Sequence, residues 1–124
     1  MALSKFGELE AVVMRRLWSY GRPASVRQVL EDLRQDRKIA YTTVQTVMDN
    51  LTRKGWLRRT RVGRAYEYEP VASREGYTAR MMREALATSD NQAAAFVHFL
   101  SELSPEEADA LRAALKIVLP EDRS

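Results

Sequence analysis

The sequence predicts a mainly helical α+β chain made of two modules. In residues 1–72, three helical runs are followed by a glycine and two short strands, whereas residues 73–124 contain helical patterns alone. The charge changes at the same point: residues 1–72 hold 14 Lys and Arg against 8 Asp and Glu, a net charge of +6, and residues 73–124 hold 6 against 9, a net charge of −3. We therefore expect a winged-helix domain over residues 1–72 and a three-helix module over residues 73–124.

Composition excludes several classes of protein. The 124 residues include no Cys and one His, so disulfides and thiolate metal sites are excluded and soft metal ligands are too few. No apolar stretch approaches the length of a membrane span, and the N-terminus MALSKFGELE lacks a signal-peptide pattern. We expect a cytoplasmic protein without membrane insertion, metal or cofactor.

Two amphipathic helices open the chain. Apolar residues recur at helical spacing from Glu8 to Tyr20, and Gly21 then ends the first helix. Ser25 offers an N-cap hydroxyl to a second helix, which is expected to end near Arg37. The apolar face of the second helix consists of Val26, Val29, Leu30 and Leu33.

The third predicted helix, from Tyr41 to Leu51, has one apolar and one polar face. The apolar positions follow the spacing i, i+3, i+4, i+7 and are Val44, Val47, Met48 and Leu51. The opposite face carries short, mostly uncharged polar side chains, which can approach and hydrogen-bond base edges in a DNA groove. The predicted base-reading residues are Thr42, Thr43, Gln45 and Thr46.

A cationic β-hairpin is predicted directly after this helix. Gly55 ends the helix, a strand begins at Trp56-Leu57 with either residue facing inward, and the turn near Gly63 leads into the return strand AYEYEP. The stretch from Arg53 to Arg64 holds six cations in a dozen positions. A solvated surface is the plain explanation, but the position beside the polar helix favours DNA contact. The predicted phosphate contacts are Arg53, Lys54, Arg58, Arg61 and Arg64.

Three short helices are predicted beyond Ser73, the last of which begins with the capping box Ser104-Pro105-Glu106-Glu107. Helices of this size bury little surface alone, so we expect them to complete their core against a second copy of the chain. The residues predicted at this homodimer interface are Tyr77, Met81, Phe96, Phe99, Leu100, Leu103, Leu111 and Leu115.

The sequence also bears on two other classes of function. No acid, base and nucleophile recur with a meaningful spacing, so the sequence does not predict an enzyme. A protein-interaction adaptor is the alternative, in which the Arg-rich hairpin docks an acidic partner, because the fold alone does not forbid it.

Three stretches of the sequence resemble the BlaI/MecI/CopY penicillinase-repressor family of winged-helix regulators. They are FGELEAVVMRRLW, AYTTVQTVMDNLTRKGWLRRTRVGRAYEYEP and LSPEEADALRAAL, and the resemblance covers nearly the whole chain. It implies a homodimeric transcriptional repressor that binds an inverted-repeat operator in double-stranded DNA through its winged-helix domains.

The resemblance also implies a regulatory mechanism. Family members control β-lactamase or β-lactam-response genes and release DNA after a membrane sensor protease cuts the dimerisation region ahead of a Phe. The candidate cleavage region in this chain contains Ala95, Phe96, His98 and Phe99. Ala95 and His98 stand where the staphylococcal type has Asn, and the absence of Cys excludes the copper-sensing cluster of the CopY type.

Overall fold

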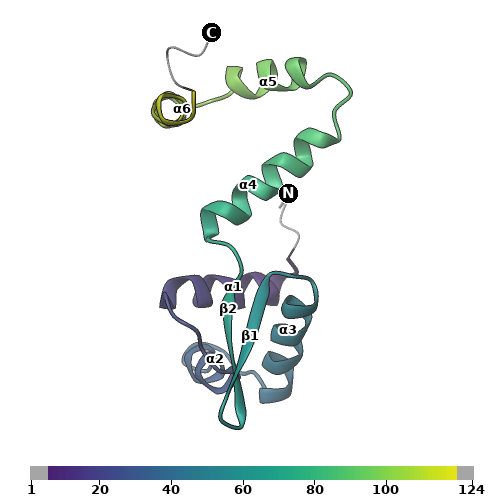
Figure 1. Ribbon diagram of the computed structural model, residues 1–124, viewed down its shortest axis with the longest axis vertical. Helices are drawn as coiled ribbons and strands as arrows, with labels where there is room; N and C mark the ends of the chain where they lie inside the picture. Colours follow the sequence, from purple (N-terminus) through teal and green to yellow (C-terminus); the bar gives the residue numbers. More distant parts are fainter. Residues whose placement is uncertain (1–5, 120–124) are drawn as a thin grey trace. The chain divides into compact units, whose positions relative to one another are not determined.

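The computed structural model describes residues 6–119 and confirms the mainly helical α+β fold (Figure 1). The elements in chain order are α1 (Glu8–Tyr20), α2 (Val26–Leu33), α3 (Tyr41–Arg53), β1 (Leu57–Val62), β2 (Ala65–Pro70), α4 (Arg74–Ala87), α5 (Gln92–Ser101) and α6 (Pro105–Val118). The chain forms two compact units, which divide between Met81 and Met82 inside α4. The domain boundary after Ala72 stays a prediction.

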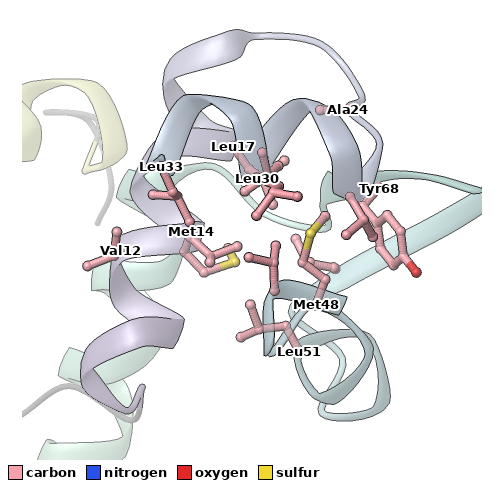
Figure 2. Packing of buried hydrophobic residues seen from close by; sticks show 14 of the residues in the cluster. Val12, Met14, Leu17, Ala24, Leu30, Leu33, Met48, Leu51 and Tyr68 are labelled. Atoms are coloured by element: carbon pink, nitrogen blue, oxygen red, sulfur yellow. The ribbon is translucent and has the colours of Figure 1, made fainter. Parts of the chain in front are cut away.

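The core of the first unit lies between α1, α2, α3 and the hairpin. Figure 2 shows side chains from all three helices converging on one apolar cluster, with Tyr68 of β2 at its edge. Its fully buried members are Val13, Met14, Leu17, Ala24, Val29, Leu30, Leu33, Val44, Met48, Leu51 and Leu57. The apolar faces expected for the first three helices are therefore the faces that pack together.

The predicted bounds of these helices are confirmed except at two ends. The first helix spans Glu8–Tyr20 as expected, and Gly21 follows it with a φ of 67°. The second helix ends at Leu33, so the prediction of an end near Arg37 is wrong. The polar residues that follow have no apolar side chain to hold them on the core, and the backbone tightens into turns. The third helix continues two residues beyond Leu51 to Arg53.

The two strands form an antiparallel hairpin. Pairing runs from Leu57 opposite Pro70 to Val62 opposite Ala65, and the turn between them contains Gly63, whose φ is 64°. A left-handed conformation at this position costs glycine little and other residues more. Tyr68 also exchanges two backbone hydrogen bonds, of 2.9 and 2.8 Å, with Ala24, which ties the hairpin to the segment before α2.

An aromatic cluster joins the first turns of α4 to the rest of the first unit. The ring of Tyr77 stacks on Phe6 at 4.4 Å and meets the edge of Trp56 at 4.8 Å, and the Arg80 guanidinium lies 4.4 Å from the Trp56 ring centre. Trp18 donates its indole N–H to the carbonyl of Ala72 at 2.9 Å. Tyr77 is therefore packed within its own chain.

The second unit contains capped helices that bury little within one chain. Asn91 caps α5, and Ser104 forms the predicted capping box with Glu107 at the start of α6. In the described part of the chain, no residue of α4, α5 or α6 is buried. Between residues 6 and 119, no helix combines the length and the apolar character needed to cross a bilayer.

Candidate nucleic-acid interface

The polar face of α3 is exposed along its first two turns. Val44, Met48 and Leu51 are fully buried and fix the rotation of the helix on the core. The predicted reading residues Thr42, Thr43, Gln45 and Thr46 are all exposed on the opposite side. No side chain caps the start of α3, where Ala40 has the extended conformation of an N-cap residue. The first two turns of α3 therefore present a short, uncharged and exposed surface.

The hairpin tip and the start of α3 lie at the same end of the first unit (Figure 1). The strand register decides which hairpin side chains share a face with α3. Arg59 and Arg61 stand opposite Tyr68 and Tyr66, and the Tyr68 hydroxyl donates to Asp49 of α3 at 2.9 Å. This face of the hairpin therefore presents cations beside the polar face of α3.

The predicted phosphate contacts Arg53, Arg61 and Arg64 are exposed around this surface. The Nε of Arg61 donates to the carbonyl of Gly63 at 3.2 Å, which holds the guanidinium near the tip. Its Cζ also lies 6.0 Å from the centre of the Tyr66 ring. Arg64 lies in the turn itself, and Arg53 ends α3.

The two remaining predicted contacts are paired with carboxylates. Lys54 Nζ lies 3.0 Å from Glu10 of α1, and Arg58 Nε lies 3.0 Å from Glu69 on the neighbouring strand. Burial of the Glu10 carboxyl raises its pKa, but hydrogen bonds from Gly7 and Lys54 outweigh this effect and lower the pKa overall. Arg58 and its partner Glu69 lie on the other face of the hairpin from Tyr68 and Arg61. The structure therefore does not bring Arg58 together with Arg61. A phosphate contact by Lys54 or Arg58 stays a prediction.

Two cations beside this surface were missed by sequence reasoning. Arg59 lies 3.6 Å from Asp49, and its guanidinium covers the Tyr66 ring at 4.2 Å. Arg27 of α2 lies 5.5 Å from the ring centre of Tyr41, the first residue of α3. Arg59 could have been found from strand alternation once Leu57 was placed inward. No sequence signal marks Arg27, because its position depends on how α2 packs against α3.

The residues predicted for the dimer interface and for cleavage lie beyond the first unit, apart from Tyr77 and Met81, and all but Leu103 lie on helices. Large apolar side chains are exposed on α5 and α6, including Phe96 (49%), Phe99 (50%) and Leu100 (46%). The other predicted interface residues in this region are Leu103 and Leu111, which are half-buried, and Leu115, which is exposed. Ala95 and His98 lie inside the regular helix α5. The dimer contact and the cleavage region stay predictions.

Residues 6–117 match the profile of the penicillinase repressor family. Two transcriptional regulators named BlaI, from Mycobacterium tuberculosis strains CDC 1551 / Oshkosh and ATCC 25618 / H37Rv, are each 44% identical to this chain over 116 residues. The match covers 91% of this chain and 84% of each relative. The resemblance read from the sequence motifs is thereby confirmed.

Solved structures of a repressor's DNA-binding domain and of a transcription regulator share the fold. The solution structure of the DNA-binding domain of the repressor BlaI has a TM-score of 0.52 and 23% identity, covering 59% of this chain and 88% of that domain. The crystal structure of MepR, a transcription regulator of the Staphylococcus aureus multidrug efflux pump MepA, has a TM-score of 0.51 and 16% identity, covering 93% of this chain and 78% of MepR. At these identities the likeness establishes the fold alone.

Proposed function

This chain belongs to the penicillinase repressor family, and we propose that it is a homodimeric repressor whose two winged-helix domains bind the halves of an inverted-repeat operator. The family consists of transcriptional regulators and not of enzymes. One observation carries the proposal at the level of the site. The exposed polar face of α3 and the cationic face of the hairpin lie at the same end of the first unit.

The geometry supports separate base and phosphate contacts with DNA. The exposed face of α3 is uncharged at Thr42, Thr43, Gln45 and Thr46, so it fits a major groove and can hydrogen-bond base edges. Arg61 and Arg64 at the hairpin tip supply positive charge that attracts phosphates on either side of the groove. Base contacts would give sequence preference, whereas phosphate contacts would give most of the affinity.

The exposed apolar side chains beyond the first unit support self-association. Phe96, Phe99 and Leu100 follow the spacing i, i+3, i+4 on α5, so they form one face of that helix. Ile117 on α6 is 82% exposed. Exposed apolar side chains of this size on a monomer would be a solubility hazard, and burying them against a second copy removes that hazard.

Steric repression and proteolytic release complete the proposal. A dimer seated on a promoter would exclude polymerase, and the family suggests β-lactamase or β-lactam-response genes as targets and a membrane sensor protease as a partner. The candidate cleavage region, Ala95 to Phe99, lies within α5. Because proteases bind extended backbone, α5 would have to unfold locally before cleavage. A cut there would separate the two DNA-binding domains and abolish their joint affinity.

A DNA-binding experiment over a series of salt concentrations tests whether the protein binds DNA as proposed. We expect the intact protein to bind a random-sequence duplex weakly and with a steep salt dependence, and to retain tighter binding to selected genomic fragments at moderate salt. The adaptor hypothesis predicts no sequence-dependent binding at moderate salt. That result would contradict the repressor assignment.

A further inference from the structure

Asp49 is an acid on the helix that we expect to meet a polyanion. It occupies the third turn of α3, and its side chain is 39% exposed. A carboxylate near phosphate is repelled, so a simple charge argument assigns Asp49 an unfavourable effect on DNA binding. The contacts of Asp49 instead favour a supporting effect on DNA binding.

Asp49 connects α3 to both strands of the hairpin. Its Oδ1 accepts a hydrogen bond from the hydroxyl of Tyr68 on β2 at 2.9 Å and lies 3.6 Å from the Arg59 guanidinium on β1. Tyr68 is itself fixed, because its ring is buried and its backbone is bonded to Ala24. Figure 2 shows its hydroxyl pointing away from the core cluster.

The same contacts fix the position of the Arg59 side chain. Its guanidinium lies over the ring of Tyr66 at 4.2 Å on one side and faces Asp49 on another. An arginine held by a carboxylate and an aromatic ring loses less conformational freedom when it then meets a phosphate oxygen. Arg59 keeps 43% of its side chain exposed, so donors remain available for such a contact.

We propose that Asp49 is a positioning residue for DNA binding: it holds Arg59, and with it the hairpin, beside the reading face of α3, so its net effect on affinity is favourable despite its charge. The inference rests on the proposed DNA-binding function. It assigns the phosphate contact to Arg59, and Asp49 acts only through Arg59, with no DNA contact of its own.

Asp49→Asn in the intact protein tests the sign of this effect, with a random-sequence duplex as the probe. The amide oxygen can still accept from Tyr68, but the charge that orients Arg59 is lost. We expect affinity to fall about two- to fivefold for each domain bound, the range typical of a partly exposed ion pair. We also expect a shallower salt dependence, although the variant is more basic than the parent. Tighter or unchanged binding would overturn the proposal.

A double-mutant comparison tests whether Asp49 acts through Arg59. Arg59→Gln should weaken binding at least as much as Asp49→Asn, and the double variant should bind no more weakly than Arg59→Gln alone. Losses that add would overturn the proposal. Because Arg59 lies on an exposed strand, unchanged binding by Arg59→Gln also overturns it, even if Asp49→Asn does not fold.

Asp36→Asn is the matched control. Asp36 is also exposed and paired with an arginine, Arg16 at 3.2 Å, but this pair joins α1 to the segment after α2. The control removes the same charge and should leave affinity unchanged or slightly higher, and equal weakening by it would overturn the proposal.

If the unmodified protein bound no duplex at all, the proposed function would fall and this inference with it. If the wild-type protein bound DNA and Asp49→Asn bound it more tightly, this inference would fall and the proposed function would stand.

Discussion

Gln45 and Arg64 supply different parts of the expected DNA contact. Gln45 is exposed on the reading face of α3, so Gln45→Ala should change which duplex is preferred. Arg64 lies in the hairpin turn, so Arg64→Ala should weaken binding to all duplexes alike and reduce the salt slope by about one per domain. Binding to a panel of duplexes over a salt series measures both effects. A uniform loss in both variants would show that Gln45 does not read bases.

Gly55 controls the junction between α3 and the hairpin. Its φ is 87°, and a Cβ built there meets no atom within 4 Å, so the cost of a side chain arises from the backbone alone. Gly55→Ala should lower the free energy of unfolding by about 1–2 kcal/mol. Gly55→Asn should cost less, because Asn tolerates the left-handed region. Chemical denaturation measures both values, and equal losses would contradict this explanation.

The exposed polar face of α3 was predictable residue by residue, but the placement of the hairpin cations was not. Helical periodicity places Val44, Met48 and Leu51 on one face, which is buried. The polar residues Thr42, Thr43, Gln45 and Thr46 are therefore left on the exposed side. In the strand, the sequence left open whether Trp56 or Leu57 begins the inward alternation. Both are buried, but Leu57 is the one within β1, so Arg59 joins Arg61 on the face beside α3. Arg58 consequently lies on the opposite face.

The helices of the first unit differ in how their N-termini are capped. Ser25 accepts from the backbone N–H of Gln28 at 3.1 Å, whereas Ala40 offers α3 no side-chain cap. Ser25→Ala should therefore cost about 1 kcal/mol of stability. Ala40→Ser should add up to about 1 kcal/mol, because the residue already has N-cap geometry. Thermal or denaturant unfolding of the two variants checks both signs, and a destabilised Ala40→Ser would contradict the expectation.

Element positions were predictable where local signals agreed. Gly21, Gly55 and Gly63 all have positive φ and mark two helix ends and the hairpin turn, and AYEYEP forms β2 with the expected bounds. The predicted end of α2 was wrong because the residues after Leu33 are common in helices but are all polar as far as Lys38. They therefore offer no apolar side chain to pack on the core. Tyr77 contacts an aromatic cluster whose members are distant in sequence, and no local pattern could show this.

The whole molecule is expected to be a dimer held by its C-terminal helices. Phe99 lies on the exposed apolar face of α5, so Phe99→Glu should place a charge in the interface and yield monomers in sedimentation equilibrium. Affinity for a two-half-site operator should then fall about 100-fold or more, since the second contact is no longer intramolecular. Ala94→Glu, at an exposed position on the other side of the same helix, is the control. A variant Phe99→Glu that remains dimeric would exclude this face as the interface.

Footprinting of the intact protein on genomic DNA tests the central claim that α3 and the hairpin form one DNA-binding surface, used twice in a dimer. The expected result is two equally protected half-sites related by two-fold symmetry, with centres separated by a whole number of helical turns of about 10 base pairs. Protection should extend to phosphates that flank each half-site, where the hairpin tips lie. Protection that follows no sequence, or a single half-site without a symmetric partner, would contradict the claim.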